Sequence, residues 1–422
     1  MTSKAMALFL EFCKIPHASF HTEEMCMWLK DYAARHHLHV QEDNAKNLLL
    51  SKGLPRLCLQ AHYDMVLVGQ KVEPIEKDGF LCSIDSSLGA DNGAALCAAL
   101  CAFDSVENLE LLITNDEEVG MLGTNALELR PKSKAMLNLD SEDLDEIIVG
   151  CAGGADVTFT FANLPLLQLE ENLCVYEIST CGFHGGHSGI DIDKGHENAI
   201  VALAQFIQGL DDVYPISISG GTKRNAIAAN AQARVLARGG LPQNEHFAVK
   251  QIIQNPPYRD CRKVLSFLTL PLLQGVQKKG ALGVELSCNV GIIQDEGDVH
   301  IQAMARGNDT YELLAFIEQL HKASEGFGAE FGQSHFYPAW EREQGGRLLD
   351  ITQHAFMSQQ QNPTITTIHA GLECGILRNK LELDEILSIG PTIHNPHSKS
   401  ERLELASFAR FESILLEILK NY

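Results

Sequence analysis

The sequence is poor in basic residues. Its 422 residues contain 33 lysines and arginines against 55 aspartates and glutamates, which gives a net charge of -22. Proteins that bind nucleic acids need clustered lysine and arginine side chains to neutralise phosphates. The composition therefore argues against a nucleic-acid partner, while an acidic surface by itself favours solubility and says little about a substrate.

Long apolar runs and spaced cysteine motifs are also missing. No stretch approaches the roughly 20 apolar residues that span a bilayer. The first twenty residues include Glu11 and Lys14 and show no cleavage site of small residues. The twelve cysteines are scattered, and the closest pair, Cys97 and Cys101, lacks the spacing of a zinc ribbon or a redox motif. We therefore expect a cytoplasmic protein with reduced thiols and no membrane partner.

Hydrophobic periodicity predicts two domains, for which the chain is long enough. Strands and helices alternate up to about Gly150, which is typical of an α/β layer sheet. The next block indicates an α+β domain, because its strands show a two-residue period and helices interrupt them. We expect an α/β domain with a mixed sheet flanked by helices, formed by residues 1–155 and 337–422, and an inserted α+β domain formed by residues 156–336.

The expected elements of the discontinuous domain are strands 46–52, 56–61, 109–114, 135–139, 364–369 and 386–389, with helices at 92–103 and 402–419. Those of the insertion are strands 157–161, 175–180, 216–219, 226–235 and 285–292, with helices at 197–209 and 310–321.

Five short acidic or histidine-bearing segments follow hydrophobic runs. They carry His62, Asp91, the pair Glu117–Glu118, Asp140 and His394. Three of them come after runs that read as buried strands, namely 57–61, 111–114 and 135–139. Because open α/β sheets place ligands at the carboxyl ends of strands, we expect these side chains to converge. His394 lies 254 residues after Asp140, so only a discontinuous domain brings it to the site.

These residue types are the ones that a two-metal hydrolase needs. Two divalent ions a few ångströms apart require one bridging carboxylate, several terminal histidine or carboxylate ligands, and a position open to water. A separate carboxylate must take the proton from that water. The segments supply two histidines and at least four carboxylates for these roles. The pattern predicts a two-metal hydrolase.

Eight stretches, in order along the chain, resemble the aminoacyl-histidine dipeptidases, also called peptidase D or Xaa-His dipeptidases. These belong to the large family of di-zinc dipeptidases, aminoacylases and glutamate carboxypeptidases. The matching stretches are 59–66, 88–93, 115–121, 138–142, 150–154, 185–189, 369–375 and 390–402. One such stretch is weak evidence, but eight in sequence are specific. The resemblance implies a di-zinc catalytic domain and, in the insertion, a lid and dimerisation domain.

The resemblance implies a role for each metal ligand. Asp91 would bridge the two ions. Glu118 and His394 would complete one ion, and His62 and Asp140 would complete the other. Zinc is the expected metal, with cobalt and manganese as alternatives, because sites with one imidazole per ion and several carboxylate oxygens accept all three.

Three further residues receive catalytic roles from the resemblance. Glu117 would be the general base that draws a proton from the bridging water. Asp64 would orient the His62 imidazole without touching a metal. His187 would reach the site of a partner subunit and stabilise the tetrahedral oxyanion, which implies a homodimer. The resemblance also implies a cis peptide between Asp91 and Asn92.

Substrate contacts are expected at three positions. The family has Pro-Arg-Glu after Ile227, which this chain lacks, but Asn225 is retained as a substrate contact. Arg306 is the candidate for binding the substrate carboxylate, because a guanidinium forms two parallel bonds to a carboxylate. Glu373, in the glycine-bounded loop 371–375, is the candidate for binding a substrate end. The chain also looks shorter than typical members of the family.

Simpler interpretations exist for single residues. Taken alone, the acidic run 116–118 is typical of a solvated helix start. His187, which lies between glycines, could be a turn residue, and Glu373 could be a surface charge. For the whole chain we expect metal-dependent hydrolysis of dipeptides, of the Xaa-His type or of broader specificity. One alternative is hydrolysis of N-acyl amino acids at the same site. The other is an inactive homologue that only binds, which predicts a missing ligand or base, yet each such position is filled.

Overall fold

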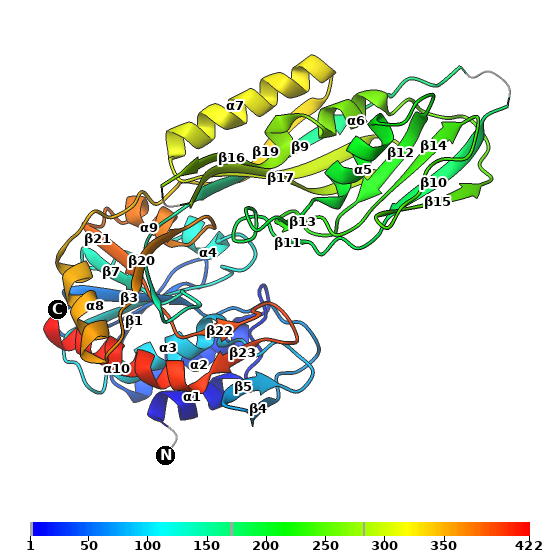
Figure 1. Cartoon of the computed structure of the whole chain (residues 1–422). Coiled ribbons are helices and arrows are strands. Elements are labelled where there is room, and N and C mark those ends of the chain that lie inside the picture. Colours follow the sequence, from blue (N-terminus) through cyan, green and yellow to red (C-terminus); the bar gives the residue numbers. More distant parts are fainter. Residues whose placement is uncertain (1–2, 169–171, 282) are drawn as a thin grey trace. The chain divides into compact units, whose positions relative to one another are not determined.

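The computed structural model describes residues 3–168, 172–281 and 283–422 and divides into two compact units (Figure 1). The first unit comprises Met1–Cys151, Trp340–Thr367 and Leu372–Tyr422, and the second comprises Ala152–Ala339 and Ile368–Gly371. The first unit is therefore discontinuous in sequence. The boundaries expected from the sequence lie within four residues of this division, apart from the short segment Ile368–Gly371.

An eight-stranded mixed sheet organises the first unit. Its order is β1 (His39–Glu42), β2 (Leu48–Lys52), β6 (Leu109–Thr114), β3 (Leu57–His62), β7 (Ala135–Asn138), β21 (Glu385–Ser388), β8 (Glu146–Cys151) and β20 (Thr364–Ile368). The four central strands β6, β3, β7 and β21 are parallel, and β1, β2 and β8 pair antiparallel. The central strands read as continuous apolar runs because both faces of a parallel sheet are covered. The expected α/β class is confirmed.

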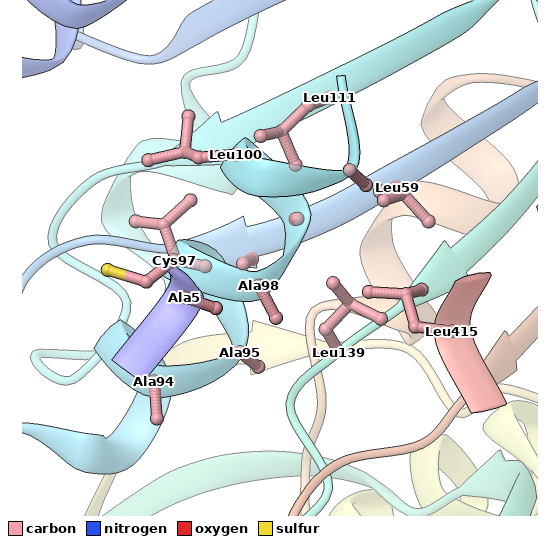
Figure 2. Close-up of a cluster of buried hydrophobic side chains, with 14 of the residues drawn as sticks. Ala5, Leu59, Ala94, Ala95, Cys97, Ala98, Leu100, Leu111, Leu139 and Leu415 are labelled. Carbon is pink, nitrogen blue, oxygen red and sulfur yellow. The ribbon is translucent and has the colours of Figure 1, made fainter. Parts of the chain in front are cut away.

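Seven helices belong to the described part of the first unit: α1 (Lys4–Phe12), α2 (Glu23–Arg35), α3 (Ala90–Ala102), α4 (Leu122–Asn125), α8 (Arg347–Ser358), α9 (Cys374–Lys380) and α10 (Leu405–Asn421). Helix α3 is buried on nearly every side, and its alanines pack with Ala5, Leu59 and Leu415 (Figure 2). A Cβ at Gly93 would lie 2.6 Å from the Phe12 ring, so only glycine permits this approach of α1 and α3.

The first unit also contains a small four-stranded sheet, which joins residues 74–83 to residues 393–404. Its order is β22 (Ile393–His394), β23 (Arg402–Glu404), β5 (Phe80–Ser83) and β4 (Pro74–Lys77). The helix expected from residue 402 therefore begins at Leu405, because residues 402–404 pair with β5 instead. This sheet joins the loop after β22 to the segment that precedes α3.

The second unit is built on a nine-stranded sheet. The main path is β15 (Phe247–Ile252), β10 (Cys174–Thr180), β14 (Ala231–Ala237), β12 (Tyr214–Gly220), β17 (Gly283–Asp295), β18 (Val299–Gly307), β9 (Gly153–Phe161) and β19 (Glu330–Tyr337), and β16 (Gln274–Gly280) pairs with β17. Helices α5 (Ala199–Gln208), α6 (Arg262–Leu268) and α7 (Thr310–Phe327) pack on it through one apolar core. The short helix η1 (Pro271–Leu273) precedes β16.

One expected strand is divided in two. Instead of a strand over 226–235, the structure has β13 (Ala226–Ile227) and β14. Strand β13 pairs with β11 (Gly186–His187) in a separate two-stranded sheet. The chain changes sheets between them, which a continuous apolar pattern does not reveal. No helix in the described part of the chain is both long and apolar enough to cross a membrane.

Candidate metal centre

Neighbouring parallel strands deliver the candidate ligands of the first unit to one edge of the sheet. His62 is the last residue of β3 and pairs with Thr114, the last residue of β6. Asp140 follows β7 by two residues, and Glu117 follows β6 by three. Because these strands are adjacent and run in the same direction, their carboxyl ends meet, as expected for a ligand site.

Two groups of ligand atoms share Asp91. In the first group, the His62 Nε2 atom lies 3.2 Å from Asp91 Oδ1 and 3.3 Å from Asp140 Oδ1. In the second, the His397 Nε2 atom lies 3.0 Å from Asp91 Oδ2 and 2.8 Å from the Glu118 carboxylate. Within each group the ligand atoms lie within 4.8 Å of one another. One oxygen of Asp91 faces each group, which is the arrangement of a bridging carboxylate.

The histidine of the second group is His397 and not His394. His394 ends β22, its ring packs edge-on against Phe80, and its Nε2 atom lies 4.0 Å from Glu404. The chain then turns through Asn395 and His397, both with positive φ, and this turn directs His397 to Asp91. The structure therefore corrects the expectation that His394 completes this ion. Both histidines lie in one matching stretch, and only the turn distinguishes them.

Asp64 positions more of the centre than expected. The His62 Nδ1–H group faces the Asp64 backbone oxygen at 3.0 Å, with the carboxylate at 3.6 Å. The same carboxylate accepts hydrogen bonds from the backbone N–H groups of Glu117 and Glu118 and from the Ser19 hydroxyl. Burial alone would raise the pKa of Asp64, but these partners, His62 foremost, hold it below its usual value. Asp64 thus orients an imidazole and the backbone of the candidate base.

The charges of the centre favour cations. Burial, together with neighbouring carboxylates, raises the pKa of Glu118 to about 7 and that of Asp140 to about 7. The pKa of Glu117 is also raised well above its usual value, first by burial and then by Glu118 and Asp140. Burial opposes the charged form of His397, yet hydrogen bonds to Asp91 and Glu118 raise its pKa to about 12.

Divalent cations fit this set of donors. Two imidazole nitrogens and several carboxylate oxygens are ligands that zinc, cobalt and manganese all accept. Excess negative charge in a buried site is the electrostatic condition that two such ions would relieve. Glu117 groups with His62 and Glu118 but is not part of either Asp91 group, as expected of a base held apart from the ligands.

Two acidic residues near the centre received no role in the sequence analysis. Burial, then the charges of Asp91, Asp140 and Glu118, raise the pKa of Glu142 to about 8. Glu401 accepts hydrogen bonds from the backbone that leads into Asp91. Both lie inside matching stretches, but neither has a spacing that marks it as functional.

Glu373 does not lie at a substrate surface. Its side chain is fully buried at the start of α9 and accepts hydrogen bonds from Gln60 Nε2 at 2.6 Å, from Thr114 Oγ1 at 2.9 Å and from the Thr124 hydroxyl. Three donors engage both carboxylate oxygens, and the residue is 0% exposed, so a substrate does not reach it. The expectation that Glu373 binds a substrate end is wrong in this geometry. Glu373 instead links β3 and β6 through its hydrogen bonds to Gln60 and Thr114.

His187 and Asn225 lie on neighbouring backbone in the second unit. His187 pairs with Ala226, and the Asn225 carbonyl accepts the Ser188 N–H at 2.9 Å. The His187 Nδ1 atom accepts hydrogen bonds from the N–H groups of Gly189 and Ile190, at 3.2 and 3.1 Å. We infer that the neutral ring therefore carries its proton on Nε2. The Asn225 side chain is exposed.

Arg306 is a buried cation on β18. Its Nη1 atom donates to Tyr337 Oη at 2.9 Å, its Nη2 atom lies 3.4 Å from Ser188 Oγ, and its Nε atom has no partner. Among the described residues it forms no ion pair, although it is only 3% exposed. A buried guanidinium without a carboxylate is costly unless an anion binds it. This environment suits a substrate carboxylate.

Known proteins resemble this chain over nearly its whole length. Residues 178–255 match the family described as a peptidase dimerisation domain. The cytosol non-specific dipeptidase of Escherichia coli (strain K12) is 29% identical, with 98% of this chain and 96% of that protein aligned. The crystal structure of aminoacylhistidine dipeptidase from Vibrio alginolyticus has a TM-score of 0.81 and 26% identity, and the match covers 99% of this chain and 96% of that one.

More distant structures share the fold alone. The aminopeptidase PepT of Bacillus cereus ATCC 10987 has a TM-score of 0.62 at 17% identity, covering 100% of this chain and 98% of that one. The alignment with the Escherichia coli protein extends over 474 residues, so this chain of 422 lacks segments that its relative has. The resemblance inferred from the eight stretches is confirmed.

Proposed function

We propose that this chain, a metallopeptidase of the dipeptidase family, hydrolyses dipeptides at a centre that holds two divalent ions. The observation that carries the proposal is the position of Asp91, whose two oxygens face two separate ligand groups. The Escherichia coli relative, at 29% identity over 98% of this chain, and the Vibrio alginolyticus structure, at 26% identity over 99%, are both named dipeptidases. A binding-only homologue would lack a ligand or the base, and none is missing here.

The ligands divide between the ions. His62, Asp140 and Asp91 would hold one ion, and Glu118, His397 and Asp91 the other. When bound, the ions would polarise the scissile carbonyl and make water a stronger acid. Zinc is the proposed metal.

The residues of the chain carry the proton and orient the groups. Glu117 takes the proton from the attacking water and delivers it to the leaving amine, because it is a half-buried carboxylate with a raised pKa beside the ligands His62 and Glu118. Asp64 holds Glu117 through its backbone and His62 through Nδ1. Such support keeps the base within reach of the reacting atoms without its own carboxylate binding a metal.

The second unit would bind the ends of the substrate. We assign Arg306 to the C-terminal carboxylate, since it is a buried guanidinium with an unpartnered Nε. His187 would donate its Nε2–H to the developing oxyanion, and Asn225 would contact the substrate beside it. Both lie in the region that matches the peptidase dimerisation domain, which supports a homodimer as the active form.

The cytoplasm is the proposed location. The Escherichia coli relative is named as a cytosolic enzyme. The described residues form no disulfide, as expected in a reducing compartment.

A substrate panel tests the proposal. Purified enzyme with measured metal content is assayed with Xaa-His dipeptides, other dipeptides, and N-acetyl and N-succinyl amino acids. We expect turnover of dipeptides and about two metal equivalents per chain. Exclusive turnover of the acyl substrates would favour the alternative amidohydrolase, which uses the same metal ligands. Full activity with fewer than two equivalents would contradict the two-ion centre.

A further inference from the structure

Four consecutive residues at the start of α3, Leu88–Asp91, direct their backbone N–H groups at one carboxylate that is remote in sequence. Glu401 Oε2 accepts from Leu88 at 2.7 Å and from Gly89 at 3.2 Å, and Glu401 Oε1 accepts from Ala90 at 2.8 Å. The Asp91 N–H lies 3.5 Å from the same oxygen. Glu401 is only 2% exposed, so water does not replace these bonds.

These N–H groups need an acceptor from elsewhere in the chain. The first N–H groups of a helix have no partner within it, and a capping side chain normally accepts one or two of them. The capping position of α3 is Gly89, which has a positive φ of 73° and no side chain to do so. Glu401 therefore caps α3 from a distance of more than 300 residues along the chain.

Glu401 also belongs to the loop that carries His397. Within this loop the Ser398 hydroxyl donates to the Asn395 carbonyl at 2.7 Å, and the Glu401 N–H donates to the Ser398 carbonyl at 3.1 Å. The short, internally bonded path from residue 397 to residue 401 leaves little freedom between them. Fixing Glu401 against the backbone of Asp91 consequently fixes where His397 lies.

We propose that Glu401 is a positioning residue of the second ion site, holding Asp91 and His397 at ligand distance before a metal binds. The inference rests on the two-ion centre proposed above. The first site depends less on this device, because adjacent strands of one sheet place its ligands His62 and Asp140 and it shares only Asp91 with the second site. Asp91 lies in the first turn of α3 and His397 on a loop 306 residues later, and Glu401 joins the two segments in the interior.

The chain offers matched controls for this role. Lys399 and Asp85 form an exposed ion pair of 2.7 Å between the same two loops, and such surface pairs contribute little. Glu404, three residues after Glu401, is a partly exposed carboxylate that does not contact residues 88–91. Asp85→Asn and Glu404→Gln therefore remove the same charge without removing the backbone bonds.

Metal binding to the apoenzyme measures the effect. Zinc is added at buffered free concentrations to the wild type, to Glu401→Gln and to both controls. The zinc bound per chain is then measured by elemental mass spectrometry. We expect two sites in wild type. In Glu401→Gln, whose amide offers one acceptor and turns its NH₂ group towards other N–H groups, we expect one site weakened by about 10–100-fold and the other, which shares only Asp91 with it, weakened much less. The controls should behave as wild type.

A double variant identifies the site that changes. In a His397→Ala background, in which the second site is already weakened, adding Glu401→Gln should change the affinity of the first site only slightly. Equal weakening of both sites, an unchanged isotherm in Glu401→Gln, or a weakening of the first site by about 10–100-fold in the double variant would overturn the inference. Fewer than two sites in wild type would instead refute the two-ion centre itself.

Amide hydrogen exchange in the wild-type apoenzyme keeps the test decisive if Glu401→Gln fails to fold. We expect the amides of residues 88–91 to be protected before metal is added, because Glu401 already accepts them. Exchange at the rate of an unstructured peptide would overturn the proposal, since the loop would then be ordered by the metal and not by Glu401.

Discussion

The two halves of the metal centre are positioned in different ways. His62 and Asp140 follow adjacent parallel strands, so the register of the sheet sets their separation. Glu118 and His397 lie on turns. Asp64 accepts the backbone N–H of Glu118, and Glu401, four residues after His397, accepts the backbone N–H groups that precede Asp91. The comparison shows that a sheet can place ligands by its own pairing, while ligands on loops depend on buried carboxylates that bind backbone N–H groups. We expect the loop-borne half to be the more easily lost.

Replacing the residue that both halves share should have the largest effect. Asp91→Ala should lose both ions and reduce turnover to background, because one oxygen faces each ligand group. Bound metal and dipeptide turnover are measured on the same sample. Retention of one tightly bound ion would show that the halves are independent and that Asp91 is not a bridge.

Removing the base should separate chemistry from binding. Glu117→Gln should keep both metals and lower kcat by about 10³-fold, since proton transfer is lost while the ligands stay in place. Metal analysis and steady-state kinetics check the two parts. Wild-type turnover in this variant would exclude Glu117 as the base.

The paired histidine variants test which residue serves the loop-borne half. His397→Ala should weaken one ion by at least about 100-fold. His394→Ala should leave both affinities unchanged, because its ring packs on Phe80 away from the ligands. Metal isotherms of the two variants, compared with His62→Ala in the sheet-borne half, provide the measurement. The reverse result would restore His394 as the ligand.

Mixing two inactive variants tests whether His187 acts across a dimer. Glu117→Gln and His187→Ala chains are mixed, dissociated and reassembled. If His187 serves the partner's site, half of the dimers contain one complete site, and activity should recover to about a quarter of wild type. Mixing that restores nothing, with heterodimers verified by mass, would show that each chain uses its own His187.

Glu373→Gln should have the smallest effect of these substitutions, and we expect that effect on the stability of the fold and not on activity. The amide keeps the shape but loses an acceptor for Gln60, Thr114 or Thr124, so we expect a loss of about 1–3 kcal/mol in the free energy of unfolding. Urea denaturation measures it, and KM for dipeptides should not change. A raised KM at unchanged stability would return Glu373 to a substrate role.

Much of the sheet-borne half could be predicted from the sequence. The buried apolar runs that precede His62 and Asp140 are a local pattern, and parallel strands convert that pattern into proximity. The expected cis peptide after Asp91 is also present. The assignments that failed, His394 and Glu373, depend on one turn and on burial by residues distant in sequence.

The sequence by itself indicated the fold class, the resemblance to dipeptidases and the residue types of the candidate metal ligands, because periodicity and strand-end chemistry are contained in short stretches. Only the tertiary structure decided that His397 faces Asp91, that the Glu373 carboxylate is buried, and that Glu401 accepts the backbone N–H groups before Asp91. Those outcomes depend on contacts across about 250 to 310 residues of chain, where sequence spacing no longer constrains distance in space.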